Sequence, residues 1–184
     1  MSLDFDGCAR GDFIVELVWD NELMIHLETR IAAPRDACFA LSLSVDAHTS
    51  SMGSSRERAV AGVTSGQMRQ GDTVTWRATH FGVPWRLTSL ISEYEAPHRF
   101  VDEQVSGPFA HWRHEHLFEE CGSVTVMRDV IDFAAPWGPL GRLADRLVLD
   151  RYMRSLIGER NAWLKTELER TTPLGPRRNR GAAS

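Results

Sequence analysis

The sequence lacks the features that mark several common classes of protein. It has three cysteines, Cys8, Cys38 and Cys121, which are odd in number and widely spaced and so fit neither a disulfide framework nor a C-x-x-C metal site. No apolar run is long enough to span a bilayer, and the acidic start of the chain is unlike a secretory signal. We therefore expect a soluble, cytoplasmic protein in a reducing compartment.

Positive charge is also scarce, since the formal net charge is −4. A nucleic-acid-binding or anionic-membrane-binding surface needs a clustered excess of Lys and Arg, and here only the last residues, with Arg177, Arg178 and Arg180, are basic. Gly71, Gly82 and Gly122 are turn residues, and no phosphate-binding pattern surrounds them. We expect no nucleic acid partner, no membrane span and no internal repeat.

What the chain does contain is enough apolar sequence for one domain. It has 184 residues, of which 42% are hydrophobic, and a chain of that size buries a substantial core. We divide it into an N-terminal extension over 1–20, one domain over 21–170 and a tail over 171–184. Alternation over 13–19 suggests a short extra strand in the extension, and the Pro, Gly and Arg content of the tail predicts disorder.

The order of predicted elements indicates an α+β fold. Period-two alternation over 24–32 predicts a strand, and Pro34 then begins a short helix. Asp46 is a good N-cap for a second short helix. Further strands separated by turn residues lead to a long amphipathic helix after Pro139. On that helix we expect four side chains to be buried against the sheet: Leu149, Met153, Leu156 and Trp163.

Two hairpins order the centre of the predicted sheet. If Cys121 and Gly122 form a two-residue loop, counting outward sets the pairs Phe118 with Thr125, His116 with Met127, and His114 with Asp129. A loop at Gly82 and Val83 sets the pairs His80 with Trp85, Ala78 with Leu87, Trp76 with Ser89, and Val74 with Ile91. Both counts match apolar faces with apolar faces. The first count also places a histidine, His114, opposite an aspartate, Asp129, on a mostly apolar surface.

An antiparallel sheet with one apolar face must be covered, and only the C-terminal helix is long enough to cover it. At this point the sequence resembles the SRPBCC or polyketide cyclase/dehydrase-like branch of the helix-grip proteins, in the START and birch-pollen-allergen superfamily. The resemblance covers roughly 24–168, is closest to a bacterial subgroup, and rests on GDTVTWRATHFG (71–82), FVDEQVSGPF (100–109), WRHEHLF (112–118) and DFAAPWGPLGRL (132–143).

The resemblance implies a helix-grip fold with a seven-stranded curved antiparallel sheet wrapped on the long C-terminal helix. Two short helices follow the first strand, and a ligand cavity lies between sheet and helix. The facing of the strand over 99–106 is open from its own pattern. A two-residue turn sends Val101, Glu103 and Val105 inward, whereas a bulge sends Phe100, Asp102 and Gln104 inward. The resemblance favours the second alternative.

The pair His114 and Asp129 has three interpretations. Asp129 could orient His114 as a catalytic acid or base. The histidines at 80, 114 and 116 could bind a metal with Asp129. The ordinary alternative is that the polar groups hydrogen-bond one another in a half-buried cavity. We expect no metal or other cofactor, because the family that the chain resembles does not typically carry one. His48 is a further candidate, either at the cavity mouth or as a helix cap.

We therefore predict a module that binds or carries a small hydrophobic or aromatic molecule, since aromatic side chains suit the wall of such a pocket. The predicted ligand-binding residues are Trp76, His80, Trp85, Asp102, Gln104, Trp112, His116, Met127, Met153 and Leu156. A cyclase or dehydratase that uses His114 and Asp129 is the alternative, and an accessory interaction domain is a further one. The oligomeric state and the ligand's identity stay open.

Overall fold

The computed structural model describes residues 23–80, 82–134 and 142–172. The N-terminal extension with its predicted extra strand, residues 135–141 and residues 173–184 of the tail lie outside the described residues. Among the described residues, no helix is long and apolar enough to cross a membrane.

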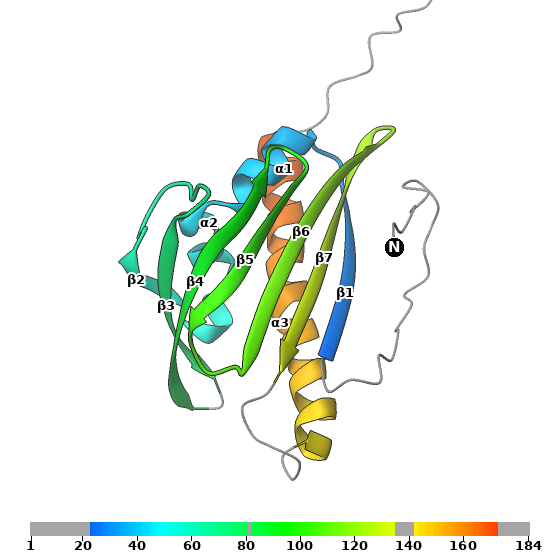
Figure 1. Cartoon of the computed structure of the whole chain (residues 1–184). Helices are drawn as coiled ribbons and strands as arrows, with labels where there is room; N and C mark the ends of the chain where they lie inside the picture. The colour runs from blue at the N-terminus through cyan, green and yellow to red at the C-terminus, as the bar shows by residue number, and fades with distance from the viewer. Residues whose placement is uncertain (1–22, 81, 135–141, 173–184) are drawn as a thin grey trace, which may run out of the picture.

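The described residues form one seven-stranded sheet and a long helix (Figure 1). The strands are β1 (Leu23–Ile31), β2 (Arg58–Gly62), β3 (Thr73–His80), β4 (Val83–Glu95), β5 (Arg99–Ser106), β6 (His111–Cys121) and β7 (Val124–Ala134). The helices are α1 (Arg35–Ser42), α2 (Val45–Ser51), the short 3-10 helix η1 (Gly53–Ser55) and α3 (Arg142–Thr171). Neighbouring strands are antiparallel in the order β1-β7-β6-β5-β4-β3-β2. The predicted helix-grip fold is confirmed.

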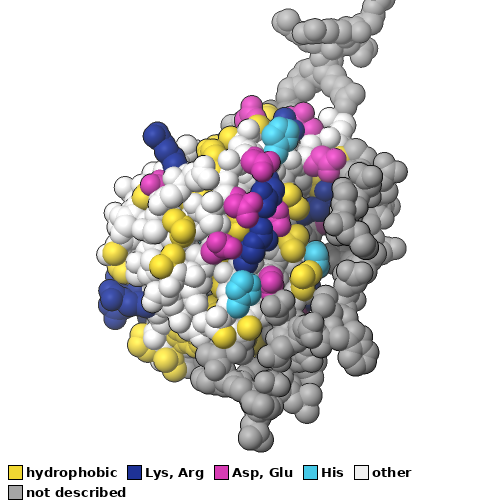
Figure 2. Space-filling view, in the orientation of Figure 1, with side chains coloured by type: hydrophobic (Ala, Val, Ile, Leu, Met, Phe, Trp, Pro, Cys, Tyr) yellow, Lys and Arg dark blue, Asp and Glu magenta, His cyan; other side chains and the backbone are white. Residues whose placement is uncertain are grey.

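The two faces of the sheet differ in chemistry because successive side chains of a strand point to opposite sides. On the inner face, β6 and β7 bury alternate residues against α3 and the short helices. On the outer face, Arg99 and Arg113 pair with Glu93 at 2.6 and 3.3 Å, and both also contact Glu115. Figure 2 shows these charges as a line of alternating acidic and basic side chains. The outer face is thus ionic and the inner face apolar.

The predicted register of both hairpins is wrong by two residues. Cys121 pairs with Val124, so that His116 faces Asp129. In the other hairpin His80 pairs with Val83. A shift of two residues leaves every side chain on its predicted face, so the hydrophobic pattern cannot detect it. The glycines decide the register instead.

Gly122 and Gly82 both have positive φ, at 65° and 76°, which places them in the loops. Gly122 takes the first loop position rather than the second. Gly82 lies directly before β4 and so takes the second loop position, whereas the count from sequence placed it first. The pattern around each glycine was right, but its place within the turn was reversed.

The short helices confirm the prediction in type and differ at one cap. The hydroxyl of Ser44 accepts a hydrogen bond from the backbone N–H of Ala47 and so caps α2. Asp46, the predicted cap, instead accepts from the backbone N–H of Gly66 at 2.8 Å. The helix α2 therefore begins earlier than predicted. Asp46 connects α2 to the segment before β3 through its hydrogen bond to Gly66.

The long helix packs on the inner face of the sheet as predicted. Met153 and Leu156 are buried, and Leu149 and Trp163 are partly buried beside the same clusters. Leu164 and Leu168 extend the buried stripe toward the α1 end of the core. Because α3 covers the apolar face, its inward side chains bear much of the stability of the fold.

We expect Leu164→Ala to lower the free energy of unfolding by about 2 to 5 kcal/mol, because Leu164 is 1% exposed and its removal leaves a cavity. The control is Thr166→Ala on the exposed side of the same helix, which should change it by less than about 0.5 kcal/mol. Urea denaturation followed by circular dichroism measures both. Equal effects of the two substitutions would contradict the packing described.

Candidate functional site

A cavity of about 150 Å³ lies on the inner face of the sheet. Its wall is contributed by α2, β3, β4, β5, β6 and α3, and most of the side chains on it are apolar. The predicted site residues that line it are Trp76, His80, Trp85, Asp102, Trp112, His114, His116, Met153 and Leu156. The strand over 99–106 thus turns Asp102 toward the cavity, which is the alternative that the resemblance favoured.

Three predicted site residues lie elsewhere. Met127 is fully buried in the core, where the hydroxyl of Ser42 lies 3.7 Å from its sulfur. Gln104 bonds the backbone of Phe109 through both ends of its amide, at 2.8 and 3.2 Å, and so holds the turn between β5 and β6. Asp129 does not line the cavity but lies behind the histidines that do. The first two have structural roles rather than places in the wall.

Asp129 is the centre of a buried polar network. Its side chain is 0% exposed. His114 Nε2 lies 2.8 Å from Asp129 Oδ1, and His116 Nδ1 lies 2.9 Å from the same oxygen, although off the direction of a good hydrogen bond. From α3, the amide of Asn161 donates to the other oxygen at 2.7 Å. Arg160 Nη1 stands 3.9 Å away.

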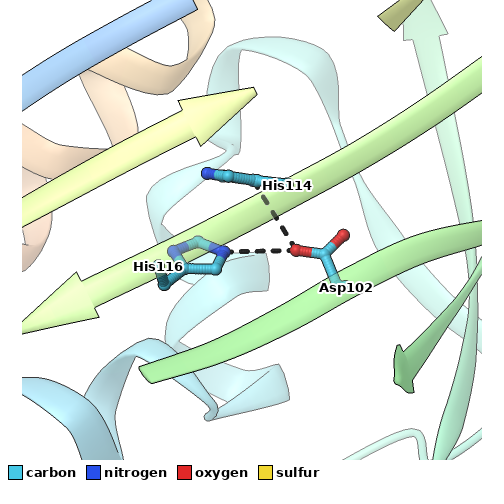
Figure 3. A group of neighbouring side chains, drawn as sticks. All are labelled: Asp102, His114 and His116. Atoms are coloured by element: carbon cyan, nitrogen blue, oxygen red, sulfur yellow. Dashed lines mark hydrogen bonds and ion pairs between the residues drawn. The ribbon is translucent and has the colours of Figure 1, made fainter. Parts of the chain in front are cut away.

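Asp102 closes the network from the neighbouring strand (Figure 3). Its Oδ2 lies 3.1 Å from His116 Nε2 and 3.6 Å from His114 Nδ1. The indole N–H of Trp112 donates to its other oxygen at 3.4 Å. The two imidazoles lie against each other with ring centres 3.8 Å apart, and Phe100 stacks on His116. Two carboxylates therefore enclose two imidazoles at one side of the cavity.

The charges of this network shift its ionisation. Burial alone would raise the pKa of Asp129, but the hydrogen bond of His114 and the nearby charges of His114 and His116 hold that pKa well below its ordinary value. The pKa of Asp102 is lowered for the same reasons, with burial again opposing. Burial and the charge of His116 lower the pKa of His114, against the hydrogen bond to Asp129. The two carboxylates therefore hold their protons less readily than free carboxyl groups do, and His114 holds its proton less readily than a free imidazole does.

A second polar group lines the cavity away from this network. His48 stacks on Trp76 with ring centres 4.1 Å apart, and its Nε2 lies 3.4 Å from Glu57 Oε1. His80 Nδ1 lies 2.6 Å from the hydroxyl of Tyr152 on α3. The charge of Glu57 also acts on His80, so His80 belongs to this group and not with His114.

Sequence reasoning missed four of these residues: Glu57, Tyr152, Arg160 and Asn161. For Asn161 a signal was present, since it falls on the buried stripe between Ile157 and Leu164 at helical spacing. A polar residue at such a position indicates a buried partner. The sequence alone does not identify that partner as Asp129.

Comparison with known proteins establishes the fold. No protein-family model and no curated protein sequence matches the chain. The Zhui aromatase/cyclase from Streptomyces sp. R1128 superimposes with a TM-score of 0.66 at 15% identity, covering 81% of this chain and 94% of that one. A START superfamily protein from Mycobacterium smegmatis gives 0.63 at 10%, covering 81% and 99%.

The major latex-like protein 151 from Panax ginseng superimposes with a TM-score of 0.61 at 11% identity, covering 80% of this chain and 98% of that one. These solved structures span the aromatase/cyclase, START and major latex-like groups, in agreement with the helix-grip fold predicted from the sequence. Identities this low establish the shared fold alone.

The second polar group generates a prediction about pH. Burial alone would raise the pKa of Glu57, but the charge and hydrogen bond of His48, with the charges of His80 and Arg160, hold it below its ordinary value. A carboxyl with a depressed folded pKa contributes stability above its unfolded pKa and loses that contribution as the pH falls through the folded one.

As the pH falls below about 4.3, the wild type should therefore lose more unfolding free energy than Glu57→Gln loses. Thermal denaturation at a series of pH values measures it. Glu120→Gln, at an exposed position on β6, is the matched control. A difference that does not change with pH would show that the Glu57 carboxylate is not stabilised by its neighbours.

Proposed function

We propose that the chain binds a small hydrophobic or aromatic molecule in this cavity, as a ligand-binding or carrier module. The observation that carries the proposal is a largely apolar cavity with polar groups gathered at two places on its wall. Ligand sites commonly combine an apolar wall with a few fixed polar groups that orient the ligand.

The aromatic wall supports a flat ligand. Trp76, Trp85 and Trp112 all line the cavity, and aromatic side chains pack well against other rings. An apolar cavity of about 150 Å³ is large enough for a single aromatic ring. We therefore propose a ligand of about one ring in the enclosed part of the site.

Polar groups in the wall support a ligand with a polar substituent. Within the described residues, the buried indole N–H of Trp85 has no hydrogen-bond partner. The guanidinium of Arg160 is buried beside the cavity, where it donates to the backbone carbonyl of Ser42 and to Asn161. An unpaired buried donor costs about 1 to 3 kcal/mol, so a ligand that accepts from Trp85 would recover that energy.

The proposal predicts that filling the cavity removes binding. Ala78 lines the cavity from β3, whereas Thr79 next to it is exposed on the opposite side. We expect Ala78→Leu to weaken the binding of single-ring aromatic compounds by about tenfold or more, which corresponds to about 1.4 kcal/mol. Thr79→Leu adds apolar atoms to the same strand and should leave affinity unchanged.

Titration of a panel of substituted single-ring aromatics, followed by tryptophan fluorescence and calorimetry, measures these affinities. Native mass spectrometry of the purified wild type would identify any molecule that it retains. If no compound of the panel binds, or if both variants bind as the wild type does, the cavity is not the ligand site.

An enzyme of cyclase or dehydratase type is the second candidate. It is favoured by His114, which lines the cavity with its Nε2 held 2.8 Å from Asp129, as a positioned general base requires. The Zhui aromatase/cyclase has the same fold at low identity. Under this alternative, His114 would remove a proton from an activated carbon of the ligand.

Deuterium exchange at the carbon next to the carbonyl of a bound aryl methyl ketone, followed by NMR, tests this alternative. The wild type should accelerate exchange over buffer, and Asp129→Asn should lower that rate by about a hundredfold while changing affinity little. His111→Gln, on the outer face of the same strand, is the control. If the wild type binds the ketone but does not accelerate exchange, the enzyme alternative is wrong and only the carrier function remains.

A further inference from the structure

The two buried imidazoles have more acceptors around them than their protons can satisfy. Each ring has one nitrogen toward Asp129 and the other toward Asp102, at separations between 2.8 and 3.6 Å. A neutral imidazole has one N–H, so in either tautomer each ring turns a lone pair toward a carboxylate oxygen. Such contacts between acceptors are unfavourable, and a further cation among them, either a proton or a metal ion, would relieve them.

The atoms that face away from Asp129 converge. Figure 3 shows the carboxylate of Asp102 pointing at both histidine rings. Asp102 Oδ2, one nitrogen of His114 and one of His116 lie within 4.8 Å of one another. Ligands about 2.1 Å from a tetrahedral Zn²⁺ are about 3.4 Å apart. The separations of the carboxylate oxygen from the two nitrogens, 3.1 and 3.6 Å, lie on either side of that value.

The groups behind these atoms are those that support metal ligands. A histidine that binds a metal usually donates its other N–H to a carboxylate, which fixes the tautomer and the ring orientation. Asp129 lies in that position for His114, and Asn161 holds its second oxygen. Its first oxygen also lies 2.9 Å from His116 Nδ1, although off the direction of a good hydrogen bond. Trp112 donates to the outer oxygen of Asp102 and leaves Oδ2 toward the histidines.

We propose that Asp102, His114 and His116 form a site for one divalent first-row transition ion, with Zn²⁺ as the first candidate. Two imidazoles and one carboxylate are donors that suit such ions. All three residues line the cavity, so a further coordination position opens toward it and can take water or an oxygen atom of a bound ligand.

This set differs from the metal set considered from sequence. His80 is not part of it, because its Nδ1 lies 2.6 Å from the hydroxyl of Tyr152 in the other polar group. Asp129 lies behind the rings and acts as a positioning residue. The inference goes beyond the proposed function and does not depend on it, since the ion is bound by protein atoms alone.

The test uses the full chain, stripped of metal with a chelator, and Co²⁺ alone as the probe. We expect one Co²⁺ per chain with the visible absorption bands of a four-coordinate ion, displaced by Zn²⁺. His114→Ala and Asp102→Asn should each weaken binding by at least about a hundredfold. His111→Ala is the matched control, because His111 also faces an aspartate, Asp132 at 3.3 Å, but on the outer side of the same strand.

A second measurement guards against variants that fail to fold. Asp102→Asn keeps the shape of the side chain, and its circular dichroism and melting are compared with the wild type first. Zn²⁺ should raise the melting temperature of the wild type and of His111→Ala, but not of Asp102→Asn, since a ligand bound to the folded state stabilises it.

Binding of Co²⁺ that is equal in the wild type and Asp102→Asn would overturn the proposal, as would the absence of binding. In that case a proton alone closes the network. Neither result changes the outcome of the Ala78→Leu titration, so failure of the metal site is distinguishable from failure of the ligand site.

Discussion

The buried carboxylate of Asp129 is the constraint on which the candidate site depends. A charge with no exposure costs several kcal/mol unless donors surround it. Those donors come from two elements, His114 on β6 and Asn161 on α3, and His116 of β6 lies against the same carboxylate. The helix must therefore dock on the sheet at one height and one rotation for Asp129 to be paired. The same contacts hold both imidazoles in place, so the packing of α3 on the sheet also sets the geometry of the site.

The alternation of strand side chains lets β6 take part in two separate structures. Arg113 and Glu115 point outward into the ionic network of the outer face, while the histidines beside them point into the cavity. The outer network is partly exposed, and each of its ion pairs contributes little. Alternation along the strand keeps these arginine and glutamate side chains on the outer face. The inner face is then left for apolar packing and for the few polar groups that have partners.

The cavity is polar at two places of different character. One is the set of Asp102, His114 and His116, backed by a buried carboxylate. The other joins His48 with Glu57, and His80 with Tyr152. Between them the wall is formed largely by aromatic and aliphatic side chains. A ligand in this cavity would therefore meet polar groups at fixed points along an apolar surface, which favours one orientation over its reverse.

The sequence by itself determined which elements form and which face most strands turn inward, because the order of apolar residues repeats with periods of 2 and 3.6. The strand over 99–106 was the exception, since its own pattern left its facing open. It therefore placed His114, His116 and Asp129 on the inner face even with the register of their hairpin wrong by two residues, a shift that preserves faces. Only the tertiary structure decided which polar groups meet there. Asp102 comes from the adjacent strand and Asn161 from a helix 32 positions after Asp129, and no local pattern specifies contacts across that separation. The docking of α3 on the curved sheet sets those distances, and with them the cavity and its buried charges.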